Sequence, residues 1–102
     1  MKILNAGSLN VDHVYRVPSI ARPGETVASL DYEVFAGGKG ANQSVALARA
    51  GATVAHAGKV GRESSWLKDK LAENGVDTAA VAVAGDEAGG HALIQVDDDG
   101  QN

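Results

Sequence analysis

The chain of 102 residues has no cysteine, two prolines, and few aromatic residues: one tryptophan, two tyrosines and one phenylalanine. Without cysteine, disulfides and thiolate metal sites are excluded. No apolar run is long enough to cross a bilayer, and Met1–Leu4 does not lead into the apolar segment of a signal peptide. We therefore expect a cytoplasmic protein that has no membrane partner.

Basic charge is also scarce. Nine Lys and Arg residues face thirteen Asp and Glu residues, which gives a net charge of −4, and the acids are scattered. Nucleic acids require a basic footprint, so no nucleic-acid partner is expected. His13, His56 and His91 lack metal-ligand spacing, and the acidic run 97–99 does not match an EF-hand loop. The sequence predicts no metal site, and we expect each histidine to be structural.

The order of apolar patterns predicts an α/β fold with a mainly parallel sheet flanked by helices. The length allows one domain at most, with a small core. Strands are expected at 3–9, 14–17, 27–35, 53–60, 81–83 and 91–96, and helices at 41–50, ending at Gly51, and from Ser64 or Ser65 to 73. Leu67 and Leu71, four residues apart, should face the core.

Two of these strands alternate between polar and apolar residues and do not suit the interior of a parallel sheet. They are 27–35 and 91–96, and we expect them to form a separate small sheet. Asp98, Asp99 and Gly100 then indicate a hairpin turn whose return strand would lie beyond Asn102. Since an unpaired edge strand is a liability, we expect the chain to be part of a longer protein or a deliberate fragment.

The run 36–44, Ala-Gly-Gly-Lys-Gly-Ala-Asn-Gln-Ser, joins a strand pattern to a helix pattern. Glycines let a ligand approach the backbone, and the start of a helix presents unpaired N–H groups. Lys39 adds a positive charge and Asn42 an amide, which suits a polyol or an anion. The run is not a P-loop, because Gly40 follows Lys39, and Gln43 stands where a dinucleotide fingerprint needs glycine. The alternative is a tight connection without a ligand.

Asn10 and Asp12 follow the first predicted strand, two residues apart. In α/β sheets, ligands bind outside the carboxyl ends of strands. Two polar side chains there suit the adjacent hydroxyls of a sugar. The alternative is an ordinary turn, since Asn and Asp cap and turn chains routinely.

Together these motifs resemble the N-terminal part of the ribokinase group in the PfkB family of carbohydrate kinases. The resemblance rests on Gly-Ser-Leu-Asn-Val-Asp at 7–12, Pro-Gly-Glu-Thr-Val at 23–27, and the run 36–44 continued through 51–61. It implies that residues 1–102 are the N-terminal part of a ribokinase-like domain, with β-sheet lid segments near 13–36 and 90–102. The C-terminal nucleotide-binding part would be absent.

The resemblance implies phosphoryl transfer from ATP to the primary hydroxyl of D-ribose. It also implies Mg²⁺ and K⁺ as cofactors of the full-length parent protein. Sugar-binding roles are implied for Asn10, Asp12, Gly37, Gly38, Lys39, Asn42, Ala92 and Ile94. Lys39 would also favour negative charge that develops near the reacting hydroxyl. Ala92 and Ile94 would form an apolar wall over the sugar. The lid would close over the sugar and form a homodimer contact.

The family's catalytic base, an aspartate in a Gly-Ala-Gly-Asp motif, has no counterpart in this chain. We therefore expect the isolated chain to be inactive. Arg62 also stands where family members often carry an acid, which bears on the local loop. Two alternatives stay open: a non-catalytic fragment or lid-mediated dimer module, and a kinase of the same family for another sugar or a nucleoside.

Overall fold

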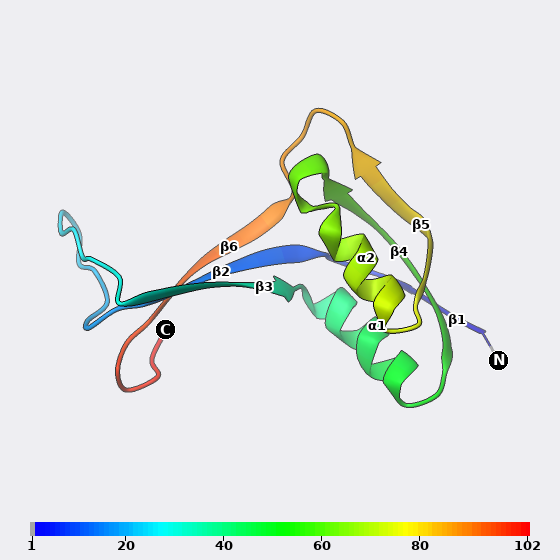
Figure 1. Cartoon of the computed structure of the whole chain (residues 1–102), viewed down its shortest axis with the longest axis horizontal. Coiled ribbons are helices and arrows are strands. Elements are labelled where there is room, and N and C mark those ends of the chain that lie inside the picture. The colour runs from blue at the N-terminus through cyan, green and yellow to red at the C-terminus, as the bar shows by residue number, and fades with distance from the viewer. Residues whose placement is uncertain (1) are drawn as a thin grey trace. The chain divides into compact units, whose positions relative to one another are not determined.

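A computed structural model describes residues 2–102, which form two sheets of three strands each (Figure 1). Contacts between residues divide the chain into two units. The first unit contains the residues up to Val11 together with Ala36–Gly90, and the second contains Asp12–Phe35 together with His91–Asn102. This agrees with the predicted fold class, a parallel sheet with helices and a second small sheet.

The sheet of the first unit has the order β1-β4-β5, and both pairs are parallel. Its strands are β1 (Lys2–Ala6), β4 (Thr53–Gly61) and β5 (Asp77–Ala84). Lys2 pairs with Thr53 and Ala6 with Ala57 along the β1–β4 ladder. The alternation of strands and helices in the sequence predicts this parallel arrangement, although β5 is longer than the expected 81–83.

Helices α1 (Lys39–Arg49) and α2 (Trp66–Glu73) cover one face of this sheet (Figure 1). Leu67 and Leu71 of α2 are buried, as their spacing predicts. The buried apolar cluster consists of Leu9, Val11, Ala41, Val54, Val60, Leu67, Leu71, Val76 and Val81. Within residues 2–102, neither helix has the length and apolarity needed to cross a membrane.

The other face of the sheet is open, and this corrects the expectation of a buried strand over 3–9. The strand β1 ends at Ala6, its residues alternate in burial, and the Leu4 side chain is 69% exposed. Val83 on β5 is also exposed. The apolar composition predicted two covered faces, whereas the helices of this chain cover one.

The helix ends follow the glycine signals more closely than the serine signals. The helix α1 begins after Gly38 (φ 102°), and Gly51 (φ 97°) follows its end. Ser65 does not cap α2 through its side chain, because a 3₁₀ turn, η1 (Arg62–Ser64), leads into the helix and Ser65 already has helical dihedrals. Ser64 Oγ instead accepts a hydrogen bond from Gly61 N at 3.1 Å.

The second sheet has the order β3-β2-β6, with β2 (Asn10–Arg16), β3 (Asp31–Gly37) and β6 (Gly90–Val96). Asn10 and Asp12 therefore lie inside a strand, which corrects the turn interpretation and the start of the expected strand at 14. The strand β3 begins at Asp31 instead of 27 and runs into the glycine run. Before it, Leu30 N donates a hydrogen bond to Arg16 O, at the end of β2, at 2.7 Å.

Aromatic side chains gather in the second unit. His13 Nδ1 lies 2.7 Å from the Tyr32 hydroxyl, and the Tyr15 and Tyr32 rings stack with centroids 4.7 Å apart. The His91 ring meets His13 edge to face at 6.1 Å. Because side chains on a strand alternate between faces, these rings and the exposed Leu93 identify one face of the second sheet.

The predicted turn after β6 is confirmed. Asp97 Oδ1 accepts hydrogen bonds from Asp99 N at 3.0 Å and Gln101 N at 2.9 Å. Gly100 has a positive φ of 78°, which suits glycine.

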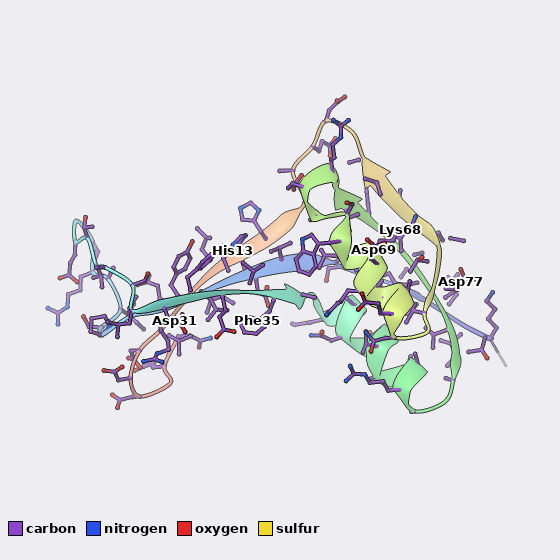
Figure 2. All side chains as sticks on the ribbon, in the orientation of Figure 1. His13, Asp31, Phe35, Lys68, Asp69 and Asp77 are labelled. Carbon is purple, nitrogen blue, oxygen red and sulfur yellow. The ribbon has the colours of Figure 1, made fainter. Side chains whose placement is uncertain are left out.

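An ion pair joins the beginnings of β1 and β5. Lys2 Nζ lies 3.2 Å from Asp77 Oδ2 (Figure 2). The pKa of Asp77 lies below its usual 3.8, chiefly because Ala79 N donates a hydrogen bond to the carboxylate and secondly because Lys2 is near. A carboxylate whose pKa is lower in the folded chain stabilises the fold above its unfolded pKa, and this contribution disappears as pH falls through the folded value.

We therefore expect Asp77→Asn to reduce the loss of stability of the chain between about pH 5 and 2. The effect should be small, because both side chains are exposed and solvent screens the pair. Urea unfolding across this pH range measures it, and Asp98→Asn, in an exposed turn, is the control. Equal acid dependence of Asp77→Asn and the unsubstituted chain would contradict the assignment.

Candidate functional site

Two glycines from distant parts of the sequence meet at the beginning of α1. A Cβ atom added to Gly7 would lie 2.8 Å from Gly40 Cα, and one added to Gly40 would lie 2.6 Å from Gly7 Cα. Both distances are shorter than any non-bonded carbon contact, so the segment after β1 and the first turn of α1 touch backbone to backbone. Only glycine at both positions permits this approach.

The carbonyl of Ser8 fixes the same turn. It accepts a hydrogen bond from Ala41 N at 3.1 Å. Gly38, at φ 102°, lies so close to this carbonyl that a Cβ there would collide with the Ser8 oxygen. The N–H groups of Lys39 and Gly40 have no acceptor among residues 2–102, which leaves donors at the positive end of the α1 dipole.

Lys39 and Asn42 are exposed on the first turn of α1, which contains no acidic residue. Asn42 N donates to Gly38 O at 3.0 Å, so the glycine run passes directly into the helix. The Asn42 side chain also borders a shallow apolar pocket between α1 and α2, with Leu9 and Lys70 among its lining residues. The turn therefore carries a cation, an amide and backbone donors.

Asn10 is half-buried at the beginning of β2, and its amide oxygen lies against Gly90. A Cβ added to Gly90 would approach Asn10 Oδ1 to 2.5 Å. The loop that leads to Gly90 is held by Glu63, whose Oε1 accepts a hydrogen bond from Gly89 N at 2.5 Å. Glu63 thus fixes the loop beside Asn10.

The remaining predicted site residues belong to the second unit. Asp12 lies on β2, and Ala92 and Ile94 lie two residues apart on β6 and so share a face. All three are half-buried. The first unit brings together Gly37 and Gly38, which precede α1, with Lys39 and Asn42 on the first turn of α1 and Asn10 on β2.

A buried polar network beneath the glycine run was missed by the sequence reasoning. Ser44 Oγ lies 2.7 Å from His56 Nδ1, and His56 Nε2 lies 3.0 Å from Gly7 O. Asn5 Nδ2 lies 3.0 Å from both Ser44 Oγ and Gly40 O. The sequence predicts a structural role for His56 and indicates no role for the Asn5 and Ser44 side chains. One sequence feature could have indicated this network: Asn5 and His56 are polar residues at inward positions of β1 and β4, which are otherwise largely apolar.

Groups suited to metal binding are dispersed. Among residues 2–102, no three His, Asp or Glu side chains gather closely enough to hold an ion. Lys39 adds an exposed cation to the hydrogen-bonding groups of the turn at the start of α1.

We expect Gly40→Ala to destabilise the chain by about 2–3 kcal/mol, because the added methyl group meets the backbone of Gly7 and Ser8, which no side-chain rotation relieves. Gly85→Ala is the matched control: its added Cβ meets only the end of the Arg62 side chain, at 3.7 Å, and should change stability by less than about 0.5 kcal/mol. Urea unfolding measures both. Equal effects of the two substitutions would show that the close approach at Gly40 does not matter.

Comparison with known proteins gives the same family over the whole chain. The family model described as "pfkB family carbohydrate kinase" matches residues 2–102. The ribokinase of Haemophilus influenzae is 43% identical over 98 residues, which cover 94% of this chain and 32% of that protein.

Solved structures agree. The ribokinase of Cryptococcus neoformans in complex with ADP is 44% identical, with a TM-score of 0.88 over 99% of this chain and 32% of that one. The Arabidopsis thaliana ribokinase complexed with ribose and ATP is 29% identical, with a TM-score of 0.81 over 99% of this chain and 33% of that one. The chain thus spans about a third of the length of these relatives.

Proposed function

Because the chain belongs to the pfkB family of carbohydrate kinases, we propose that it forms the sugar-binding part of an ATP-dependent kinase that phosphorylates D-ribose at its primary hydroxyl. The observation that carries this proposal is the turn at the start of α1, where Gly38 and Gly40 pack on the backbone of Gly7 and Ser8. A surface formed by backbone and bearing unpaired N–H donors suits a ligand with many hydroxyls.

In this proposal the polar side chains bind hydroxyl groups. Asn10 offers an amide oxygen held against Gly90, and Asn42 offers an amide at the first turn of α1. Asp12 accepts hydrogen bonds from hydroxyls as a carboxylate. Gly37 and Gly38 leave room for the sugar, and Ala92 and Ile94 provide apolar surface. Relatives named ribokinase, one of them solved with ribose and ATP, support ribose over other sugars.

The proposed reaction forms a bond between the sugar oxygen and the γ-phosphorus of ATP, breaks the bond to ADP, and removes the hydroxyl proton. Such reactions depend on positioning and charge stabilisation. Lys39 supplies positive charge toward the oxygens on which negative charge develops. We assign no base within this chain. In the proposal, Mg²⁺ and K⁺ serve the full-length kinase.

We expect the chain to bind D-ribose and Asp12→Ala to weaken that binding by about 1.5–3 kcal/mol, the contribution of a hydrogen bond to a charged group. Calorimetry measures the affinity, and ribose-induced chemical-shift changes of the Gly37 and Gly38 backbone amides locate the binding site. Asp98→Ala removes an exposed carboxylate from the turn after β6 and should leave affinity unchanged.

Three outcomes would contradict parts of this assignment. Unchanged ribose affinity in Asp12→Ala would remove Asp12 from the site. Tighter binding of deoxyribose, fructose or a nucleoside than of ribose would keep the family and change the substrate. Ribose-dependent ADP formation by the chain alone would show that it holds a catalytic base, against the proposal.

We also propose that the second sheet pairs with a second copy of the chain. The supporting observation is its exposed apolar face: Leu93 is 71% exposed, and Tyr32 and Val34 on β3 are also exposed. Large apolar side chains exposed on one sheet are typical of interaction sites. A non-catalytic dimer module remains the competing interpretation, distinguished by dimer formation without ribose binding.

Leu93→Glu should convert the dimer to monomer, because the carboxylate would be buried without a partner in the pairing. Sedimentation velocity measures the mass. Val83→Glu is the matched control, since Val83 is also exposed but lies on the first unit. A mass that is monomeric before substitution, or unchanged after it, would contradict the pairing.

A further inference from the structure

We propose that Asn5, Ser44 and His56 are positioning residues that act as one unit to set the geometry of the glycine run at the start of α1. The proposal rests on the proposed sugar-binding role of that run. The three side chains come from β1, α1 and β4, and Ser44 and His56 are fully buried. Because Ser44 and His56 have no exposed surface, we propose that their effect on binding passes through the backbone.

Two backbone carbonyls fix the donors at the two ends of this network. Gly40 O only accepts, so Asn5 Nδ2 donates to it, and its second hydrogen points to Ser44 Oγ. Gly7 O only accepts as well, so His56 Nε2 carries a hydrogen. Ser44 then donates its own hydrogen to His56 Nδ1. In the neutral ring this arrangement is the Nε2–H tautomer of His56, in which Nδ1 accepts the hydrogen of Ser44.

The network is a continuous chain of hydrogen bonds between two backbone carbonyls. It begins at Gly40 O, passes through Asn5, Ser44 and His56, and ends at Gly7 O. Gly7 and Gly40 are the two residues whose backbones touch. The side chains therefore hold both partners of this contact from below, while Ser8 O holds Ala41 N beside it.

A satisfied buried network fixes one geometry, whereas a broken one leaves groups that cost free energy. Removing the Ser44 hydroxyl leaves His56 Nδ1 without a donor and one Asn5 hydrogen without an acceptor. Replacing both Ser44 and His56 by apolar residues leaves fewer buried polar groups without a partner. The double substitution should therefore reduce the free energy of unfolding by less than the sum of the two single substitutions.

The first test is the tautomer of His56 in the unsubstituted chain, measured by ¹⁵N chemical shifts of the ring. The result expected is a hydrogen on Nε2 and none on Nδ1. A hydrogen on Nδ1 at neutral pH would overturn the directional network. This measurement requires no substitution and no sugar.

The second test is hydrogen exchange at Ala41 N, which bonds to Ser8 O, in the absence of sugar. Ser44→Ala and His56→Phe should each accelerate it about tenfold relative to the amides of β5, and the double variant by less than the product. Ser65→Ala, an exposed serine without a side-chain cap bond, is the matched control. Equal acceleration of exchange at every amide would indicate general destabilisation and would overturn the positioning role. A double variant whose acceleration equals the product of the two single accelerations would also overturn it.

The third test is ribose affinity, which should fall about tenfold in Ser44→Ala and stay unchanged in Ser65→Ala. If the unsubstituted chain binds ribose and Ser44→Ala binds it equally well, the positioning role for the sugar is overturned. If the unsubstituted chain does not bind ribose, the proposed function fails, and the tautomer and exchange results still decide whether the network holds the glycine run.

Discussion

The backbone contact between Gly7 and Gly40 is the constraint on which the first unit depends. It lets the start of α1 lie directly against the segment that follows β1, with no side chain between them. Once these backbones touch, Ser8 O reaches Ala41 N, and Gly38 must adopt a φ that favours glycine. The glycines at these positions are therefore explained by the close approach of two backbones.

A contact between glycines supplies little apolar area, so other interactions must hold it in place. The Asn5, Ser44 and His56 network does so in the interior, where its bonds join β1, α1 and β4. The apolar cluster continues on the same face of the sheet with Val54 and Leu67. A hydrogen-bonded network inside an apolar layer favours one arrangement, because displacement of any member leaves a buried polar group without a partner.

The sequence predicted the order of elements, the parallel sheet and the glycine ends of α1 and α2, because these depend on local pattern and on φ. It failed where tertiary contacts decide. Ser65 has the chemistry of a cap, yet the 3₁₀ turn before it removes the need for one. Leu4 reads as buried, yet no helix of this chain covers its face. The site turn was predictable from its glycines, whereas the network beneath it joins residues up to 51 positions apart, from Asn5 to His56, and has no local pattern.

The two units differ in what stabilises them. The first unit has a buried cluster, whereas Val17 is the only buried apolar side chain within the described part of the second unit. A three-stranded sheet without a core is marginal by itself. Asp12, Ala92 and Ile94 lie on this less stable unit, so binding that engages them also stabilises their strands. Part of the binding free energy would then be used to order the second sheet, and a second copy of the chain that covers its apolar face would reduce that cost.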